Sequence, residues 1–216
     1  MFIGHYAVGF AAKRAAPNAS LGPLMAAPIL LDLLWPIFLL AGWEHVRIDP
    51  GNTAFTPLAF DSYPISHSLI ASIGWAALFG GLYWAFTRYR AGAVAIALGV
   101  VSHWVLDWVT HGPDLPLYPG GPKVGLGLWD SIPGTLAVEF AMLAIALWLY
   151  VRTTQPRDRT GRYGFWAFVA FALIMYVGNL MSPPPPSTRA LAWFALTGWI
   201  VPFWAGWFDA HRSAAK

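Results

Sequence analysis

Three polar residues recur at helical spacing inside an apolar stretch of this chain. His103, Asp107 and His111 stand four residues apart in a stretch that begins near residue 91. In a helix, positions i, i+4 and i+8 lie on one stripe that covers about 80° of arc. Imidazole and carboxylate groups are ligands that suit Zn²⁺, and equally Mn²⁺ or Fe²⁺. The spacing therefore makes a metal-binding stripe geometrically possible.

Four further ionisable residues lie in other apolar stretches. They are His5, Asp32, His67 and Glu139. Counting about 1.5 Å per helical residue from the expected ends of each stretch places these groups, with His103 and Asp107, toward the outer half of a bundle. An ionised Asp at bilayer depth costs about 2.5–3.5 kcal/mol, and these stretches contain no Lys or Arg to offset that cost. What remains is water, a shared proton or a bound metal ion.

Each of these residues also has a structural interpretation. Asp32 could be a buried acid bonded to a serine or a backbone group, and His67 could cap a helix. A neutral Glu139 could form a hydrogen bond across helices. The pair His103 and Asp107 favours function most strongly, because packing in an apolar helix seldom needs a His and an Asp four residues apart.

The elements that carry these groups are those of a membrane protein. The chain has 216 residues, of which 57% are hydrophobic and 11% charged, against about 25% charged in soluble domains. A hydrocarbon core of about 30 Å needs roughly 20 apolar residues of helix. Six stretches meet this need: 23–42, 65–87, 91–110, 131–151, 164–182 and 190–208. We therefore expect an all-α, polytopic membrane helix bundle that forms one domain over residues 1–216.

The composition also excludes several classes of protein. Because the chain contains no cysteine, a disulfide scaffold, a cysteine-based zinc finger and a thiol nucleophile are excluded. A formal net charge of +3 is too small to argue for binding to nucleic acid. The expected partner is membrane lipid, with a lipid-like substrate.

The basic residues predict an orientation in the membrane. Ten of the 13 Lys and Arg residues fall at alternate ends of the stretches, and only Arg47, Lys123 and Arg189 occupy the opposite loops. By the positive-inside rule, both termini face the cytoplasm and the connections 43–64, 111–130 and 183–189 face outward. The apolar segment 2–12 is too short to span and precedes its basic residues, unlike a signal peptide, so we expect a half-helix packed against the bundle.

Several of these residues stand in short motifs that resemble a known family. The motifs are Gly4-His5, Leu31-Asp32, Ser66-His67-Ser68 and Ser102-His103-x3-Asp107-x3-His111-Gly112. Over about residues 1–112 they resemble the small bacterial inner-membrane proteins described as predicted membrane-bound metal-dependent hydrolases. More remotely, the order of His and Asp residues is similar to that of the zinc-dependent phospholipase C superfamily.

The resemblance implies metal ligation by a set of six side chains. They are His5, Asp32, His67, His103, Asp107 and His111. The chain departs from the family pattern in two motifs. It keeps one acid where Pro-Asp-x-Asp-His is common, and it reads Ser62-Tyr63-Pro64-Ile65-Ser66-His67-Ser68 where His-Arg-x-x-Thr-His-Ser is common. His5 and His111 could compensate for the missing ligands, or the site could be mononuclear.

The first functional hypothesis is a metal-dependent hydrolase that acts on a lipid or lipid-linked ester at the outer half of the membrane. A divalent metal, zinc before manganese or iron, would activate water. Glu139 is the first candidate for the general base and Asp61 the second, while Arg189 or Lys123 could hold an anionic headgroup.

Two other functions use the same residues. A metal-free phosphatase could use the His103 and Asp107 pair, but its basic residues, Arg88 and Arg90, are expected on the opposite side of the membrane. A metal-ion or proton transporter could use the His/Asp cluster as a relay, although its polar groups should then spread across the whole depth. The transporter is the main alternative.

Overall fold

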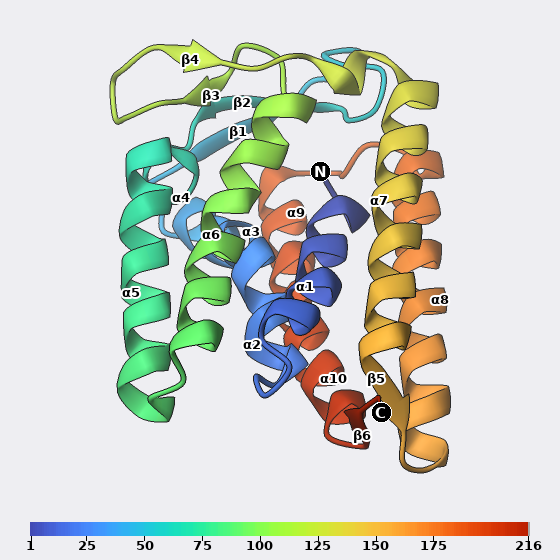
Figure 1. Ribbon diagram of the computed structural model, residues 1–216. Coiled ribbons are helices and arrows are strands. Elements are labelled where there is room, and N and C mark those ends of the chain that lie inside the picture. Colours follow the sequence, from blue (N-terminus) through green and yellow to red (C-terminus); the bar gives the residue numbers. More distant parts are fainter. Residues whose placement is uncertain (216) are drawn as a thin grey trace.

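Six helical spans form the bundle in the computed structural model, which describes residues 1–215 (Figure 1). Four spans are single helices from end to end, and two are interrupted by a short 3-10 turn. Their bounds are Leu21–Leu40 (α2 Leu21–Ala26, η1 Ala27–Ile29, α3 Leu30–Leu40), Leu69–Thr87 (α5), Arg90–Thr110 (α6), Ile132–Thr153 (α7), Arg159–Met181 (α8) and Thr188–Asp209 (α9 Thr188–Ala195, η3 Leu196–Trp199, α10 Ile200–Asp209). The predicted all-α membrane bundle and its number of spans are confirmed.

The two ends of the bundle carry different connections. One end, here called the hairpin end, carries the pairs β1 (His45–Ile48) with β2 (Leu58–Ser62) and β3 (Leu115–Pro116) with β4 (Lys123–Val124), followed by the short η2 (Leu128–Asp130) (Figure 1). The other, basic end carries β5 (Thr154–Pro156) paired with β6 (Arg212–Ala214). All three pairs are antiparallel. The basic residues that were expected on one side lie at the basic end, apart from Lys216, which lies outside the described residues.

The sequence did not predict these strands, because they are only two to five residues long and pair through their backbones. The alternation of polar and apolar residues in His45-Val46-Arg47-Ile48 was a weak signal for β1.

The expected half-helix is present as α1 (Ile3–Ala15), three residues longer at its end than predicted (Figure 1). Its 13 residues span about 20 Å, too little to cross the hydrocarbon core. It packs between α6 and α7, begins inside the bundle and ends at the basic end with Lys13 and Arg14 in its last turn. The first residue therefore lies inside the bundle, whereas the last described residues lie at the basic end. Which side of the membrane each end faces stays a prediction.

Three of the predicted continuous segments are interrupted. Pro28 stands in η1, between α2 and α3. Ser68 has an extended ψ of 151° and separates α4 (Pro64–His67) from α5. Gly198 lies in η3, before Pro202 in α10. Proline lacks a backbone N–H, so such breaks persist only where neighbouring groups use the freed carbonyls.

Close approach of α6 to the first break positions the site. A Cβ atom added at Gly99 would lie 3.0 Å from Cβ of Ala27, so glycine lets the helix approach η1 closely. His103 follows Gly99 by four residues and therefore faces the same neighbour. The break and the small residue together bring the His103 ring against Pro28.

A buried ion pair joins the first helix to the last. Lys13 Nζ lies 2.7 Å from Asp209 Oδ2 and also donates to the carbonyl of Ala19. The Asp209 carboxylate accepts further hydrogen bonds from the Leu21 backbone N–H and the Tyr150 hydroxyl. These four bonds tie α1, α2, α7 and α10 together at the basic end.

Removing this carboxylate should destabilise the bundle strongly. Asp209→Ala leaves Lys13 charged and buried without its partner, and we expect the free energy of unfolding to fall by about 3–5 kcal/mol. The matched control is Asp61→Ala, which removes an exposed ion pair with Arg47 and should cost about 1 kcal/mol or less. Thermal denaturation in detergent measures both, and equal losses would contradict the role given to the buried pair.

Candidate metal centre

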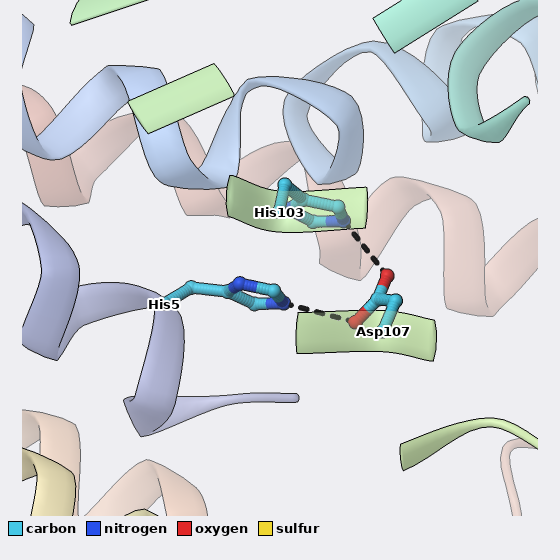
Figure 2. Close-up of side chains that lie close together, drawn as sticks. All are labelled: His5, His103 and Asp107. Atoms are coloured by element: carbon cyan, nitrogen blue, oxygen red, sulfur yellow. Dashed lines mark hydrogen bonds and ion pairs between the residues drawn. The ribbon is translucent and has the colours of Figure 1, made fainter. Parts of the chain in front are cut away.

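The carboxylate of Asp107 lies at the centre of four imidazole rings. His5 Nε2 is 3.1 Å from its Oδ1, and His103 Nε2 is 2.9 Å from its Oδ2, as Figure 2 shows. His67 and His111 each place Nε2 3.9 Å from the same Oδ2. The rings of His5 and His103 are stacked, with centroids 4.0 Å apart. The four imidazoles around Asp107 therefore come from α1, from α4, from its own helix α6, and from the residue that caps the end of α6.

Asp32 adds a second carboxylate to this centre. Its Oδ1 lies 3.5 Å from His67 Nε2 and 3.8 Å from His103 Nε2. Potential ligand atoms of Asp32, His67 and His103 all lie within 4.8 Å of one another, as do those of His5, His103 and Asp107. The two groups share His103. The six side chains that were expected to bind metal are thus brought together, with His111 at the edge.

Hydrogen bonds behind the rings fix which nitrogen of each histidine faces the centre. His103 Nδ1 lies 2.8 Å from the carbonyl oxygen of Pro28, which can only accept, so Nδ1 carries the proton. Ser66 Oγ donates to Glu44 Oε2 at 2.6 Å and therefore accepts from His67 Nδ1 at 2.6 Å. Both histidines consequently turn an unprotonated Nε2 toward the centre when they are neutral.

These two bare nitrogen atoms face each other. His67 Nε2 and His103 Nε2 are 3.2 Å apart, and while both rings are neutral neither nitrogen carries a hydrogen that could form a bond between them. Two ligands of a tetrahedral zinc ion with bonds of 2.0–2.1 Å lie about 3.4 Å apart. The separation, the outward N–H partners and the carboxylates nearby all fit a divalent cation held between them.

The amino group of Met1 is a further neighbour of Asp107. It lies 2.6 Å from Oδ1 and 3.3 Å from the hydroxyl of Thr110. The two oxygen atoms of Asp107 thus have different surroundings, since Oδ1 meets this amine and His5 while Oδ2 meets the other three imidazoles. This contact could not be predicted from the sequence, because nothing in the residue types indicates where the first residue lies in the fold.

Helix N-termini stabilise the other carboxylates of this region. Asp32 lies in the first turn of α3, where the helix dipole favours a negative charge. Glu139 is fully buried, and its Oε2 accepts hydrogen bonds from the backbone N–H groups of Phe2 at 2.9 Å and Gly4 at 2.8 Å, at the start of α1. Glu139 thus contacts the backbone that carries His5, but it belongs to neither group of potential ligands. Its role as a base stays a prediction.

Three predicted site residues lie at the hairpin end, outside the cluster. Asp61 forms an exposed ion pair with Arg47 at 2.8 Å. Lys123 donates to the backbone carbonyls of Phe60 and Asp61. Arg189 lies at the start of α9 and lines a pocket with Glu44 and Trp193. Their predicted roles as base and headgroup ligands remain untested.

The residues that support the histidines were not predicted. Glu44 is almost fully buried, and besides Ser66 Oγ it accepts hydrogen bonds from the backbone N–H groups of Ile65 and Ser66. Asp114 Oδ1 lies 2.9 Å from His111 Nδ1 and accepts from the hydroxyl of Tyr63 at 3.2 Å. Burial raises the pKa of Tyr63 well above its usual value, so the phenol stays protonated and donates. The position of Ser66 directly before His67 was the only signal in the sequence.

The fold and the site together define a polytopic helical membrane protein with an internal centre of histidines and carboxylates. A family model described as YdjM inner membrane protein matches residues 1–184. The chain therefore belongs to the YdjM inner membrane protein family, and this agrees with the expected bacterial inner membrane. Comparison with curated proteins and with solved structures finds no match.

Elemental analysis tests the centre directly. After dialysis without chelator, we expect near-stoichiometric zinc or manganese in the wild-type protein, and its loss in His103→Ala and Asp107→Ala, because these side chains offer ligand atoms at the middle of the cluster. His45→Ala, which removes an exposed histidine at the hairpin end, should keep the metal. Bound metal should also fall as the pH is lowered, since protons compete for the imidazoles. A folded wild-type protein that takes up no added zinc would contradict the site.

A second measurement tests the support behind His67. Ser66→Ala removes the hydroxyl that holds Nδ1, and we expect metal affinity to fall by about 10–100-fold. Ser102→Ala is the matched control, because that hydroxyl donates to the carbonyl of Gly99 and touches no histidine ring. Competition with a fluorescent chelator measures both affinities, and equal affinities in the two variants would refute the positioning role.

Proposed function

We propose that the protein is a metal-dependent hydrolase that cleaves an ester or phosphoester of a membrane lipid. The observation that carries this proposal is the convergence of four imidazole Nε2 atoms on the Asp107 carboxylate, with the Asp32 carboxylate beside two of them, inside a bundle of apolar helices. The residues that would hold the ion are His67, His103, Asp107 and Asp32, with His5 and His111 beside them. A bound zinc, manganese or iron ion would supply Lewis acidity and lower the pKa of a coordinated water.

The side chains of the centre differ in how far they are exposed to solvent, and this supports a catalytic site over a closed structural site. The side chains of His67, His103 and Asp107 are between 0% and 5% exposed, whereas that of Asp32 is 48% exposed. A structural zinc site is closed by protein ligands, while a catalytic site keeps one side accessible. Water and substrate would therefore approach the centre past Asp32.

Proton transfer falls to Glu139 in this proposal. Its Oε2 is held by two backbone N–H groups, while its buried Oε1 has no hydrogen-bond partner in the described part of the chain. A carboxylate held in one orientation with one free oxygen suits a general base. The bonds to Phe2 and Gly4 link its position to that of His5 on the same helix.

The surroundings of the bundle point to a lipid as substrate. Large apolar side chains are exposed along the spans, for example Ile70, Leu98, Ile145 and Phe203. In a bilayer these faces contact acyl chains, so the molecules that can reach the centre from the side are lipids. The hydrolytic water would enter by the same open side or from the hairpin end.

A metal-ion or proton transporter is the alternative, and the distribution of buried charges does not favour it. Along α1, the cluster at His5 is separated from the buried Lys13 by residues 6–12, in which the Tyr6 phenol is the only ionisable group. A transport path would need polar groups through this depth. The polar groups instead form two separate sets, one at the centre and one at the basic end.

Turnover of phospholipids tests the proposal. Zinc-loaded protein in nanodiscs is given fluorescent phosphatidylglycerol, phosphatidylethanolamine and phosphatidate, and product is followed by chromatography. We expect Asp107→Ala to abolish turnover through loss of the ion. Glu139→Gln should retain the metal and slow turnover by about 10²–10⁴-fold, the usual contribution of a general base.

The control for this experiment is Asp61→Asn, which changes the second candidate base at the exposed hairpin and should turn over lipid at the wild-type rate. Turnover by Asp107→Ala protein at the wild-type rate would overturn the proposal. Metal uptake into sealed proteoliposomes without any lipid hydrolysis would favour the transporter instead.

A further inference from the structure

A pocket lies at the hairpin end, where the end of α3, the start of β1 and the start of α9 meet. Its volume is about 580 Å³, enough for the headgroup of a lipid. We call it the α3–α9 pocket. Its lining includes Leu39, Glu44, His45, Val46, Arg189 and Trp193.

The walls of this pocket have two characters. Leu39, Val46 and Trp193 form apolar surface, whereas the side chains of Arg189 and His45 are exposed and form no hydrogen bond or ion pair within residues 1–215. The Glu44 carboxylate is already saturated by Ile65 and Ser66. The guanidinium of Arg189 is therefore a cation with no protein partner beside an apolar wall.

From this arrangement we propose that the α3–α9 pocket binds the phosphate group of an amphiphilic ligand, with Arg189 as the principal donor. Guanidinium groups bind phosphate through two parallel N–H···O bonds, which are stronger than neutral hydrogen bonds. The apolar wall would contact the first carbons of the ligand, and the exposed ring of Trp193 stands where the pocket meets the lipid-facing surface. The ligand class is a phosphate-bearing lipid.

The pocket is connected to the metal centre by short paths. Two hydrogen bonds, each of 2.6 Å, lead from the Glu44 wall through Ser66 to the ring of His67. On α3, Leu39 follows Asp32 by seven residues, which places them on the same side of the helix and about 10 Å apart along its axis. A single lipid molecule can thus bind its phosphate in the pocket and place its ester bond near Asp32. This assignment of the headgroup rests on the proposed function, whereas binding itself does not.

Lys123, the other cation expected to hold a headgroup, offers the matched control. It lies at the same end of the bundle, but its amino group donates to the carbonyls of Phe60 and Asp61 and does not line the pocket. Neutralising it removes the same charge from the same end without touching the proposed site.

Binding is measured by isothermal titration with dihexanoyl phosphatidate, on protein treated with chelator, in wild-type and His103→Ala backgrounds. We expect Arg189→Gln to weaken binding at least tenfold, Arg189→Lys to weaken it less, and Lys123→Gln to leave it unchanged. Because the measurement involves no metal and no turnover, its result does not depend on whether the protein is a hydrolase. Equal affinity of the wild-type and Arg189→Gln proteins would overturn the proposal.

Two further ligands identify what the pocket recognises. Inorganic phosphate should bind at least tenfold more weakly than the phosphatidate. If the two bound with equal affinity, the ligand of the pocket would be a free phosphate anion and not a lipid. Dihexanoylglycerol lacks the phosphate and should bind weakly with no dependence on Arg189. Tight binding of this neutral lipid would overturn the assignment of the phosphate.

Discussion

A carboxylate inside an apolar bundle must be surrounded by donors or cations, and Asp107 is where this requirement is most severe. The apolar stretches 23–42, 65–87, 91–110, 131–151, 164–182 and 190–208 contain no Lys or Arg, and four imidazoles and one amine surround the Asp107 carboxylate instead. Bringing them there requires α1 to enter the bundle, α4 to end beside α6, and α6 to approach the break at Pro28. Three elements of the hairpin-end half of the molecule, α1, α4 and α6, thus meet at this one group.

Helix starts also stabilise four other acids of the bundle, of which Asp32 is half exposed and the other three are buried. Glu139 accepts from the start of α1, Glu44 from the start of α4, and Asp209 from the start of α2, while Asp32 lies in the first turn of α3. The breaks in the spans create additional helix starts at membrane depth. An interrupted helix therefore supplies partners that a continuous one would use internally.

The sequence was sufficient to predict the spans and much of the centre. Hydropathy marks each span within a few residues, and the repeat of His103, Asp107 and His111 has a helical period that is independent of context. The convergence of Asp32, His67 and His5 could be predicted from their estimated depths in the membrane, because residues at the same level of a helix bundle can contact one another. Glu44 could not be found in this way, because it acts through a two-bond path from a loop, and the pocket of Arg189 depends on how α9 packs against α3.

The half-helix has a consequence for biogenesis. Residues 3–15 emerge before the six spans during synthesis, yet they are too short to cross the bilayer, and the partner of their buried lysine lies 196 positions later. Contacts of α1 with α6 and α7 can form before the last span is inserted, but Lys13 has no buried carboxylate partner until α10 is in place. A chain that ended before Asp209 would therefore have to bury this lysine unpaired, so the seating of the half-helix depends on synthesis of the last span.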